Sequence, residues 1–321
     1  MQNNPLLSVA DLKKYFYIKK GFREVQVLKA VDGVSFQLHP GEALGVVGES
    51  GCGKTTLGRT VLRLYDPTSG VIFFDGRDVC HLPYPELRKM RGRMQIVFQD
   101  PYSSLNPRIT VGKMLNQILY CHGVEDALER KERCADVMEK VGLEQGHLKR
   151  YPHEFSGGQR QRIAIARALI LYPSLIVADE PSSALDMSIQ AQILNLMKSL
   201  QKEMNIAYLF ITHNLSAARF LCDRIAVMYL GKVVELASRT QLFEHPCHPY
   251  TKALLPLCPT PDPDSRVAQV PLKGEVPSPV NPPAGCRFHP RCPEAKERCS
   301  QDGPELIEIE PGHEVACHLF T

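Results

Sequence analysis

A glycine-rich turn, Gly48-Glu-Ser-Gly-Cys-Gly-Lys54-Thr55, constrains the fold of this chain more than any other feature of its sequence. The apolar run Ala43–Val47 before it predicts a buried strand, and apolar residues at helical spacing after it predict a helix. Glycines let a backbone wrap so that several N–H groups face an anion, and the following helix adds its positive end. The pattern predicts a phosphate-binding loop in an α/β domain.

Within this loop, Lys54 is expected to contact the β- and γ-phosphates of a nucleotide, and the Thr55 hydroxyl is expected to bind Mg²⁺. A chance glycine-rich turn would lack the flanking strand and helix. The motif alone indicates only nucleotide binding, because kinases and GTPases carry it too. The residues expected to contact ATP in the loop are Gly48, Ser50, Gly51, Cys52, Gly53, Lys54, Thr55 and Thr56.

A second apolar strand, Leu175–Ala178, ends in Asp179 and Glu180. In open α/β sheets, ligands bind at the carboxyl ends of the strands. Asp179 is therefore expected to hold Mg²⁺, directly or through water, and Glu180 to act as a general base on a water that attacks the γ-phosphate. In the alternative interpretation, the two acids are solvated and merely start the next loop. The phosphate loop upstream makes this alternative the weaker one.

The rest of the chain alternates apolar strands with helices, which indicates a largely parallel sheet. Short strands are expected at 6–9, 25–29 and 33–38, mostly helix from 108 to 170, and a strand at 207–211. Composition changes near residue 240, after which more than half of the 25 prolines follow. Proline excludes long helices and central strands, so 241–321 is expected to be a separate, irregular extension.

Charge and apolar patterning exclude several classes of protein. The formal net charge is +3, from 38 basic and 35 acidic residues, so nothing in the totals calls for nucleic acid. The first residues do not resemble a signal peptide, and the apolar runs are too short to span a bilayer. If the protein serves a membrane process, another chain is expected to cross the membrane.

The segment from Phe155 to Arg162, Phe-Ser-Gly-Gly-Gln-Arg-Gln-Arg, identifies a family. Ser156 and Gln159 form an S-x-x-Q capping box that opens a helix, and the two glycines leave backbone N–H groups bare for an anion. The segment resembles the signature motif of ATP-binding cassette (ABC) ATPases. The resemblance implies that Ser156, Gly157, Gly158 and Gln159 close on ATP held by the phosphate loop of a partner subunit.

Other motifs of that family follow in order, and the resemblance covers residues 6–240. It implies that Gln99 senses Mg²⁺ and the attacking water and links the site to a membrane partner. Ser183–Asp186 resembles the loop at the dimer interface, and His213 resembles the histidine on the γ-phosphate. Phe16 is where the family stacks an aromatic ring on adenine, with Tyr15 as the alternative. The implied fold is a RecA-like P-loop domain with antiparallel β and helical subdomains, the latter at about 100–170.

Two further segments, Gln99–Arg108 and His248–Thr251, resemble the ATPase subunits of dipeptide and oligopeptide importers, and nickel importers share both. This resemblance implies a peripheral protein on the cytoplasmic face of a bacterial inner membrane, of the second ATPase type. Its partners would be a paralogous ATPase, two transmembrane permeases and, indirectly, a periplasmic or lipid-anchored peptide-binding protein. A soluble ABC ATPase acting on ribosomes or DNA is the alternative, but such proteins usually carry two cassettes. The transported solute stays open.

Four cysteines near the end of the chain follow the pattern C-x5-C-x6-C-x17-C: Cys286, Cys292, Cys299 and Cys317. This pattern lacks the close pairs of zinc ribbons and the spacing of ferredoxins, but four thiolates can hold a [4Fe–4S] cluster or Zn²⁺. Free thiols or adventitious disulfides are the remaining alternative. The importer resemblance favours the cluster. With zinc, His289 or His318 could replace one thiolate.

Overall fold

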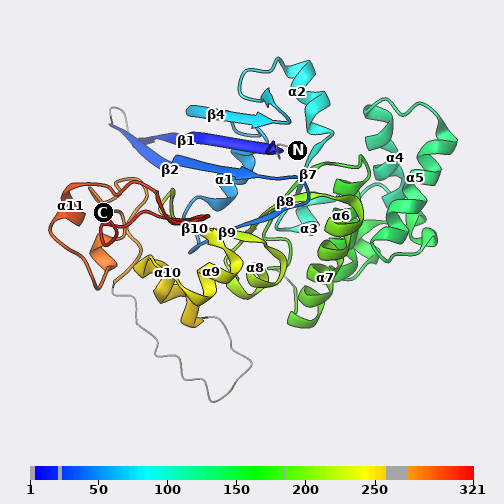
Figure 1. Ribbon diagram of the computed structural model, residues 1–321. Helices are drawn as coiled ribbons and strands as arrows, with labels where there is room; N and C mark the ends of the chain where they lie inside the picture. Colours follow the sequence, from blue (N-terminus) through cyan, green and yellow to red (C-terminus); the bar gives the residue numbers. More distant parts are fainter. Residues whose placement is uncertain (1–3, 21–23, 184, 258–273) are drawn as a thin grey trace. The chain divides into compact units, whose positions relative to one another are not determined.

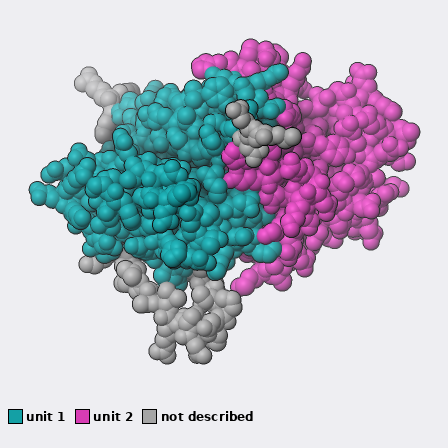
Figure 2. Space-filling view, in the orientation of Figure 1, with its two compact units in different colours: residues 1–38, 43–80, 211–321 teal, residues 39–42, 81–210 magenta. Residues whose placement is uncertain are grey.

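The computed structural model describes residues 4–20, 24–183, 185–257 and 274–321 (Figure 1). The chain divides into two compact units, which Figure 2 colours separately. Unit 1 comprises residues 1–38, 43–80 and 211–321, and unit 2 comprises residues 39–42 and 81–210. Among the described residues, no helix has the length and apolar character needed to cross a bilayer.

Unit 1 contains most of the strands. In chain order its elements are β1 (Leu7–Lys20), β2 (Glu24–Leu38), β3 (Ala43–Val47), α1 (Lys54–Val61), β4 (Ser69–Phe74), β5 (Arg77–Asp78), α8 (Leu215–Leu221), β9 (Arg224–Tyr229), β10 (Lys232–Ser238), α9 (Arg239–Glu244), α10 (Pro249–Leu254), the 3₁₀ helices η3 (Leu255–Leu257) and η4 (His289–Arg291), α11 (Arg298–Gln301), β11 (Ile307–Glu310) and β12 (His313–Val315).

Two sets of strands organise unit 1. The first is an antiparallel sheet in the order β2-β1-β4-β5. The second has the order β11-β12-β10-β9-β3, in which β3 and β9 are parallel and the other pairs are antiparallel. Strand β3 is buried along its whole length, as a strand covered on both faces should be. It leads directly into the phosphate loop.

The three short strands expected at 6–9, 25–29 and 33–38 form two longer strands. Strand β1 runs from Leu7 to Lys20 instead of ending at Val9, and β2 is one strand from Glu24 to Leu38 instead of two. In β1, lysines and aromatic residues that are half-buried or exposed obscure the alternation of apolar and polar residues that marks a strand. Shifts in the pairing register between Val9 and Tyr15 interrupt this alternation further.

Unit 2 carries most of the helices. Its elements are α2 (Tyr84–Arg91), β6 (Met94–Val97), α3 (Pro101–Ser104), α4 (Val111–Cys121), α5 (Ala127–Lys140), the 3₁₀ helices η1 (Gln145–Lys149) and η2 (Pro152–Glu154), α6 (Gly157–Leu169), β7 (Leu175–Asp179), α7 (Met187–Met204) and β8 (Ala207–Thr212), whose last two residues belong to unit 1.

The helical content predicted for 108–170 is confirmed by α4, α5 and α6. Strands β6 and β7 are parallel, and the order in this unit is β8-β7-β6. A boundary between domains near residue 240 stays a prediction. Beyond it, β12 pairs with β10, so the extension adds strands to a sheet of unit 1 (Figure 1).

Candidate active site

The glycine-rich turn after β3 has the conformation that only glycine adopts readily. Values of φ are 154° at Gly48, 79° at Gly51 and 106° at Gly53. A Cβ at Gly48 would lie 2.1 Å from the carbonyl oxygen of Met228, and one at Gly53 would lie 1.9 Å from that of Ala30. Backbone conformation and lack of space therefore both require glycine at these two positions.

Lys54, the first residue of α1, is only 5% exposed. Its Nζ donates to the carbonyl oxygens of Gly48 (2.8 Å) and Glu49 (2.9 Å), so the ammonium group lies within the turn. Gly53 caps α1 without a side chain, so no cap competes with an anion for the first N–H groups of the helix. The turn therefore has the positive charge and the uncapped N–H groups of a phosphate-binding loop.

The other predicted loop residues line the same turn. Ser50 and Gly51 are exposed at its tip, whereas Thr55 and Thr56 are half-buried in the first turn of α1. Cys52 is buried, and burial raises the pKa of its thiol although Lys54 acts in the opposite direction. The thiol therefore stays neutral at physiological pH.

The two candidates for adenine stacking differ in how they are held. The Tyr15 hydroxyl donates to the Asp32 carboxylate, and burial together with this bond raises the pKa of Tyr15. Phe16 is half-buried and meets the ring of Tyr65 edge to face, with centroids 5.6 Å apart. Lys14 Nζ also lies over the Phe16 ring, 5.1 Å from its centroid, so both candidate rings have contacts within unit 1.

His213 follows β8 and is exposed. The next residue, Asn214, caps α8 by accepting from the N–H of Ala217 (3.1 Å). The histidine is thus fixed between a buried strand and a capped helix while its ring remains accessible to solvent.

In unit 2, the two predicted acids stand at the end of β7, whose residues are all buried. Asp179 is 1% exposed, while Glu180 is half-buried and adopts φ = 48°, in the left-handed region. A residue other than glycine is uncommon there and marks strain that active sites often hold. Gln99 Nε2 donates to Glu180 Oε2 at 3.2 Å, so the structure brings together two residues that lie far apart in sequence.

The loop after Glu180 is tied back to it. The N–H and the hydroxyl of Ser183 both donate to the Glu180 carbonyl oxygen, at 3.2 and 3.1 Å. Ala184 lies outside the described residues, and Asp186 is the N-cap of α7.

The capping box predicted at the start of α6 is confirmed. Ser156 Oγ accepts from the N–H of Gln159 (3.3 Å), and Gln159 Oε1 accepts from the N–H of Ser156 (3.0 Å). A Cβ at Gly158 would lie 2.6 Å from Cγ2 of Ile189, so that position needs glycine for packing, while Gly157 is half-buried. Ser156 is exposed, so the helix start faces solvent.

The four C-terminal cysteines lie close enough in unit 1 to interact electrostatically. Burial raises the pKa of the Cys286, Cys292 and Cys317 thiols, that of Cys292 to about 11. Each of the four sulfurs also accepts backbone N–H groups. Cys286 accepts those of Phe288 and His289, Cys292 that of Glu294, Cys299 that of Lys296, and Cys317 that of Leu319. Such bonds stabilise thiolates bound to a metal.

The two alternative histidine ligands have other partners. Both ring nitrogens of His318 are engaged, with the Asp302 carbonyl oxygen (2.9 Å) and the Thr321 hydroxyl (3.3 Å). Nδ1 of His289 lies 2.9 Å from the Cys286 carbonyl oxygen. His318 is therefore engaged at both ring nitrogens, whereas the contact of His289 involves Nδ1 and not Nε2.

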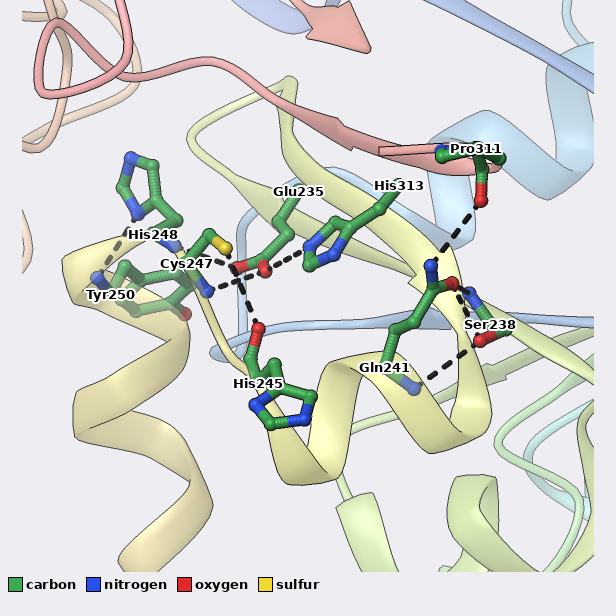
Figure 3. A network of polar contacts seen from close by, with 9 residues as sticks. All are labelled: Glu235, Ser238, Gln241, His245, Cys247, His248, Tyr250, Pro311 and His313. Atoms are coloured by element: carbon green, nitrogen blue, oxygen red, sulfur yellow. Dashed lines mark hydrogen bonds and ion pairs between the residues drawn. The ribbon is translucent and has the colours of Figure 1, made fainter. Parts of the chain in front are cut away.

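One cluster was not found by sequence reasoning. Glu235, Cys247 and His313 offer donor atoms within 4.8 Å of one another (Figure 3). Glu235 is fully buried, and its oxygens accept from the N–H groups of Cys247 (2.8 Å) and His248 (2.9 Å), while His313 Nε2 lies 2.8 Å from Oε1. Because backbone N–H groups already occupy both oxygens, the cluster is a hydrogen-bonded junction between segments.

Comparison with known proteins identifies the family. Residues 31–183 match the family model of the ABC transporter, and residues 234–299 match that of the oligopeptide/dipeptide transporter, C-terminal region. The oligopeptide transport ATP-binding protein AppF of Bacillus subtilis (strain 168) is 53% identical, over 98% of this chain and 98% of its own. The chain belongs to the ATP-binding proteins of ABC transporters. A putative peptide import ATP-binding protein of Brucella ovis is 51% identical over 99% of this chain and 98% of its own.

Solved structures agree with this assignment. The dimeric, post-hydrolysis state of the ATP-binding cassette MJ0796, bound to ADP and Pi, is 30% identical, with a TM-score of 0.65. The match covers 73% of this chain and 98% of that one. The P-loop fold expected from the sequence is therefore confirmed, and the chain is an ABC ATPase, an ATP-hydrolysing enzyme.

Proposed function

We propose that this ABC ATPase energises the import of di- or oligopeptides across a bacterial inner membrane. The observation that carries the proposal is the match of residues 234–299 to the C-terminal region of oligopeptide/dipeptide transporters, beside near full-length similarity to AppF. Nickel is the alternative solute, but the names of the similar proteins favour peptides. Residues 1–240 would form the ATP-binding domain, with a helical subdomain at about 100–170, and 241–321 the extension.

In this proposal the protein lies on the cytoplasmic face of the membrane and pairs with a paralogous ATPase. The pair would act on two transmembrane permeases that receive peptide from a periplasmic or lipid-anchored binding protein. The exposed start of α6 supports pairing, because its bare N–H groups suit the phosphates of ATP bound to another subunit. No nucleic acid takes part.

Each site residue has a proposed role. Lys54 and the N–H groups of the glycine-rich turn bind the phosphates, and Mg²⁺ is held by Thr55, Asp179 and Gln99. Phe16 stacks on adenine, and His213 contacts the γ-phosphate. Glu180 directs water onto the γ-phosphate, which the Gln99 side chain supports by holding its carboxylate.

Replacing Glu180 by Gln tests this assignment. Loss of the general base should lower kcat by about 10²-fold or more. ATP binding should persist and the nucleotide-bound pair should accumulate, as measured by sedimentation with ATP. Glu203→Gln removes a carboxylate elsewhere in the same unit and serves as the control. Hydrolysis by Glu180→Gln near the rate of the control would show that Glu180 is not the base.

We also propose that Cys286, Cys292, Cys299 and Cys317 hold a [4Fe–4S] cluster, with Zn²⁺ as the alternative. Four buried or half-buried thiols, each accepting backbone N–H groups, fit this donor set. The bound group would cross-link a segment with few apolar side chains.

Metal analysis of protein purified without oxygen tests this proposal. Iron and acid-labile sulfide should copurify with the chain and be lost in Cys292→Ser. Cys121→Ser, which removes an exposed thiol elsewhere, should keep them. Zinc in their place would support the alternative, and protein with neither metal would refute both.

A further inference from the structure

Two side chains from the C-terminal region contact Glu49, the second residue of the phosphate loop. Both terminal nitrogens of Arg291 donate to its carboxylate, at 2.7 and 3.1 Å. The Tyr250 hydroxyl accepts from the Glu49 N–H at 3.0 Å. The Arg291 side chain is 7% exposed and that of Glu49 25%, so solvent screens the ion pair only in part.

Tyr250 is held in place by the junction centred on Glu235 (Figure 3). The Glu235 carboxylate accepts the N–H groups of Cys247 and His248, which fixes the turn before α10. Nδ1 of His248 then accepts from the N–H of Tyr250 at 3.0 Å. His313, at the start of β12, closes the junction from the other side of the carboxylate.

The Tyr250 ring is fully buried, which keeps its hydroxyl directed at the loop. It packs against Tyr229 and Phe288, with centroids 4.8 and 5.3 Å away. Arg291 follows in the same segment as Phe288 and reaches the loop beside this aromatic cluster. Glu49 therefore makes one neutral hydrogen bond with Tyr250, whose ring is held by aromatic packing, and one bidentate ion pair with Arg291.

We propose that Arg291 and Tyr250 are positioning residues for the phosphate loop, and that through them the C-terminal region sets the affinity for ATP. The loop binds phosphate through backbone N–H groups, so an anchored loop loses less conformational entropy when ATP binds. Arg291 also neutralises a carboxylate in the loop that would otherwise repel the triphosphate. The inference rests on the proposed nucleotide site and adds a second segment of the chain to it.

The affinity of purified chain for ATP tests the proposal. Arg291→Ala should raise the Kd for Mg-ATP by about tenfold, since a charge-assisted contact is lost and the Glu49 charge is left unpaired. KM should rise with Kd, while kcat changes little, because neither residue has a proposed role at the attacking water. Arg298→Ala removes an exposed positive charge from the same segment and should bind ATP as the wild type does.

A second substitution separates charge from folding. Glu49→Gln in the Arg291→Ala chain removes the repulsion and should restore much of the affinity, which no general loss of structure would allow. Arg291→Lys keeps the charge but loses the bidentate geometry, so its Kd should be intermediate. Tyr250→Phe keeps the packing and loses only the acceptor, and should raise Kd a few-fold.

The outcomes distinguish this inference from the nucleotide site itself. If wild-type chain fails to bind ATP, or Lys54→Ala binds it equally well, the site is misplaced. If wild type binds ATP but Arg291→Ala matches Arg298→Ala, the positioning role is refuted. If Glu49→Gln restores no affinity to the Arg291→Ala chain, neutralisation of the Glu49 charge is refuted. Should Arg291→Ala lower the melting temperature too far for measurement, Arg291→Lys and Tyr250→Phe decide, and wild-type affinity in both refutes the role.

Discussion

Lowering the pH should decrease the free energy of unfolding through protonation of His248, the first residue of the His-Pro-Tyr segment. Its side chain is buried and its Nδ1 accepts a backbone N–H, so the neutral ring is the form that the fold requires. Burial, and to a lesser extent the charge of Lys252, lowers the pKa of His248 to about 3. In the unfolded chain the same ring has a pKa of about 6.5.

The sign and size of the effect follow from proton binding. Between about pH 3 and 6.5 the unfolded chain binds a proton that the folded chain does not, so the free energy of unfolding decreases as the pH falls. The contribution of His248 is fully present above about pH 6.5, and each unit below it removes about 1.4 kcal/mol. At about pH 5.5 the expected loss is about 1.4 kcal/mol.

Urea unfolding at about pH 7.5 and 5.5 measures this loss. In a His248→Asn chain, the new amide oxygen can still accept the N–H of Tyr250, as asparagine does at helix N-caps, but the side chain does not titrate. The wild type should therefore lose about 1.4 kcal/mol more than this variant between the two pH values. His153→Asn removes an exposed ring and is the control. Equal pH dependence in wild type and His248→Asn would refute the reasoning.

Three smaller predictions concern single groups. Gly53→Ala should abolish ATP binding in a fluorescent-nucleotide assay, because its Cβ would clash with the Ala30 carbonyl oxygen. Ser156→Ala should lower the free energy of unfolding in urea by about 1 kcal/mol, through loss of the N-cap bond. Tyr208→Phe should leave the free energy of unfolding unchanged or raise it by up to about 1 kcal/mol, since the buried hydroxyl has no hydrogen-bond partner among the described residues.

The sequence was sufficient for the parts of the fold that local rules determine. Ala43–Val47 is a buried strand, the glycine-rich turn needs glycine, and the capping box at Ser156 forms, because each depends on residues within a few positions. Gln99 and Glu180 were both assigned to the attacking water, but their hydrogen bond was not predicted, since no local pattern reports a contact across such a separation in sequence.

Contacts between the C-terminal region and the phosphate loop could not be predicted. Glu49 occupies a position that the phosphate-loop pattern leaves open, and Arg291 lies among prolines and cysteines that predict no regular element. Only the fold places one beside the other. The His-Pro-Tyr segment was a mark of family resemblance, whereas its physical role depends on the buried carboxylate of Glu235, which sequence reasoning did not single out.

The extension is therefore more than an irregular segment that follows the ATPase. Two of its charged contacts with the rest of unit 1, Arg291 with Glu49 and Arg287 with Asp32, come from residues next to Cys292 and Cys286. Asp32 in turn accepts the hydroxyl of Tyr15, beside the proposed adenine-stacking ring. If these cysteines hold a group as proposed, its removal should loosen both arginines and raise the Kd for Mg-ATP, whereas an unchanged Kd after removal would show that the arginines keep their contacts without it.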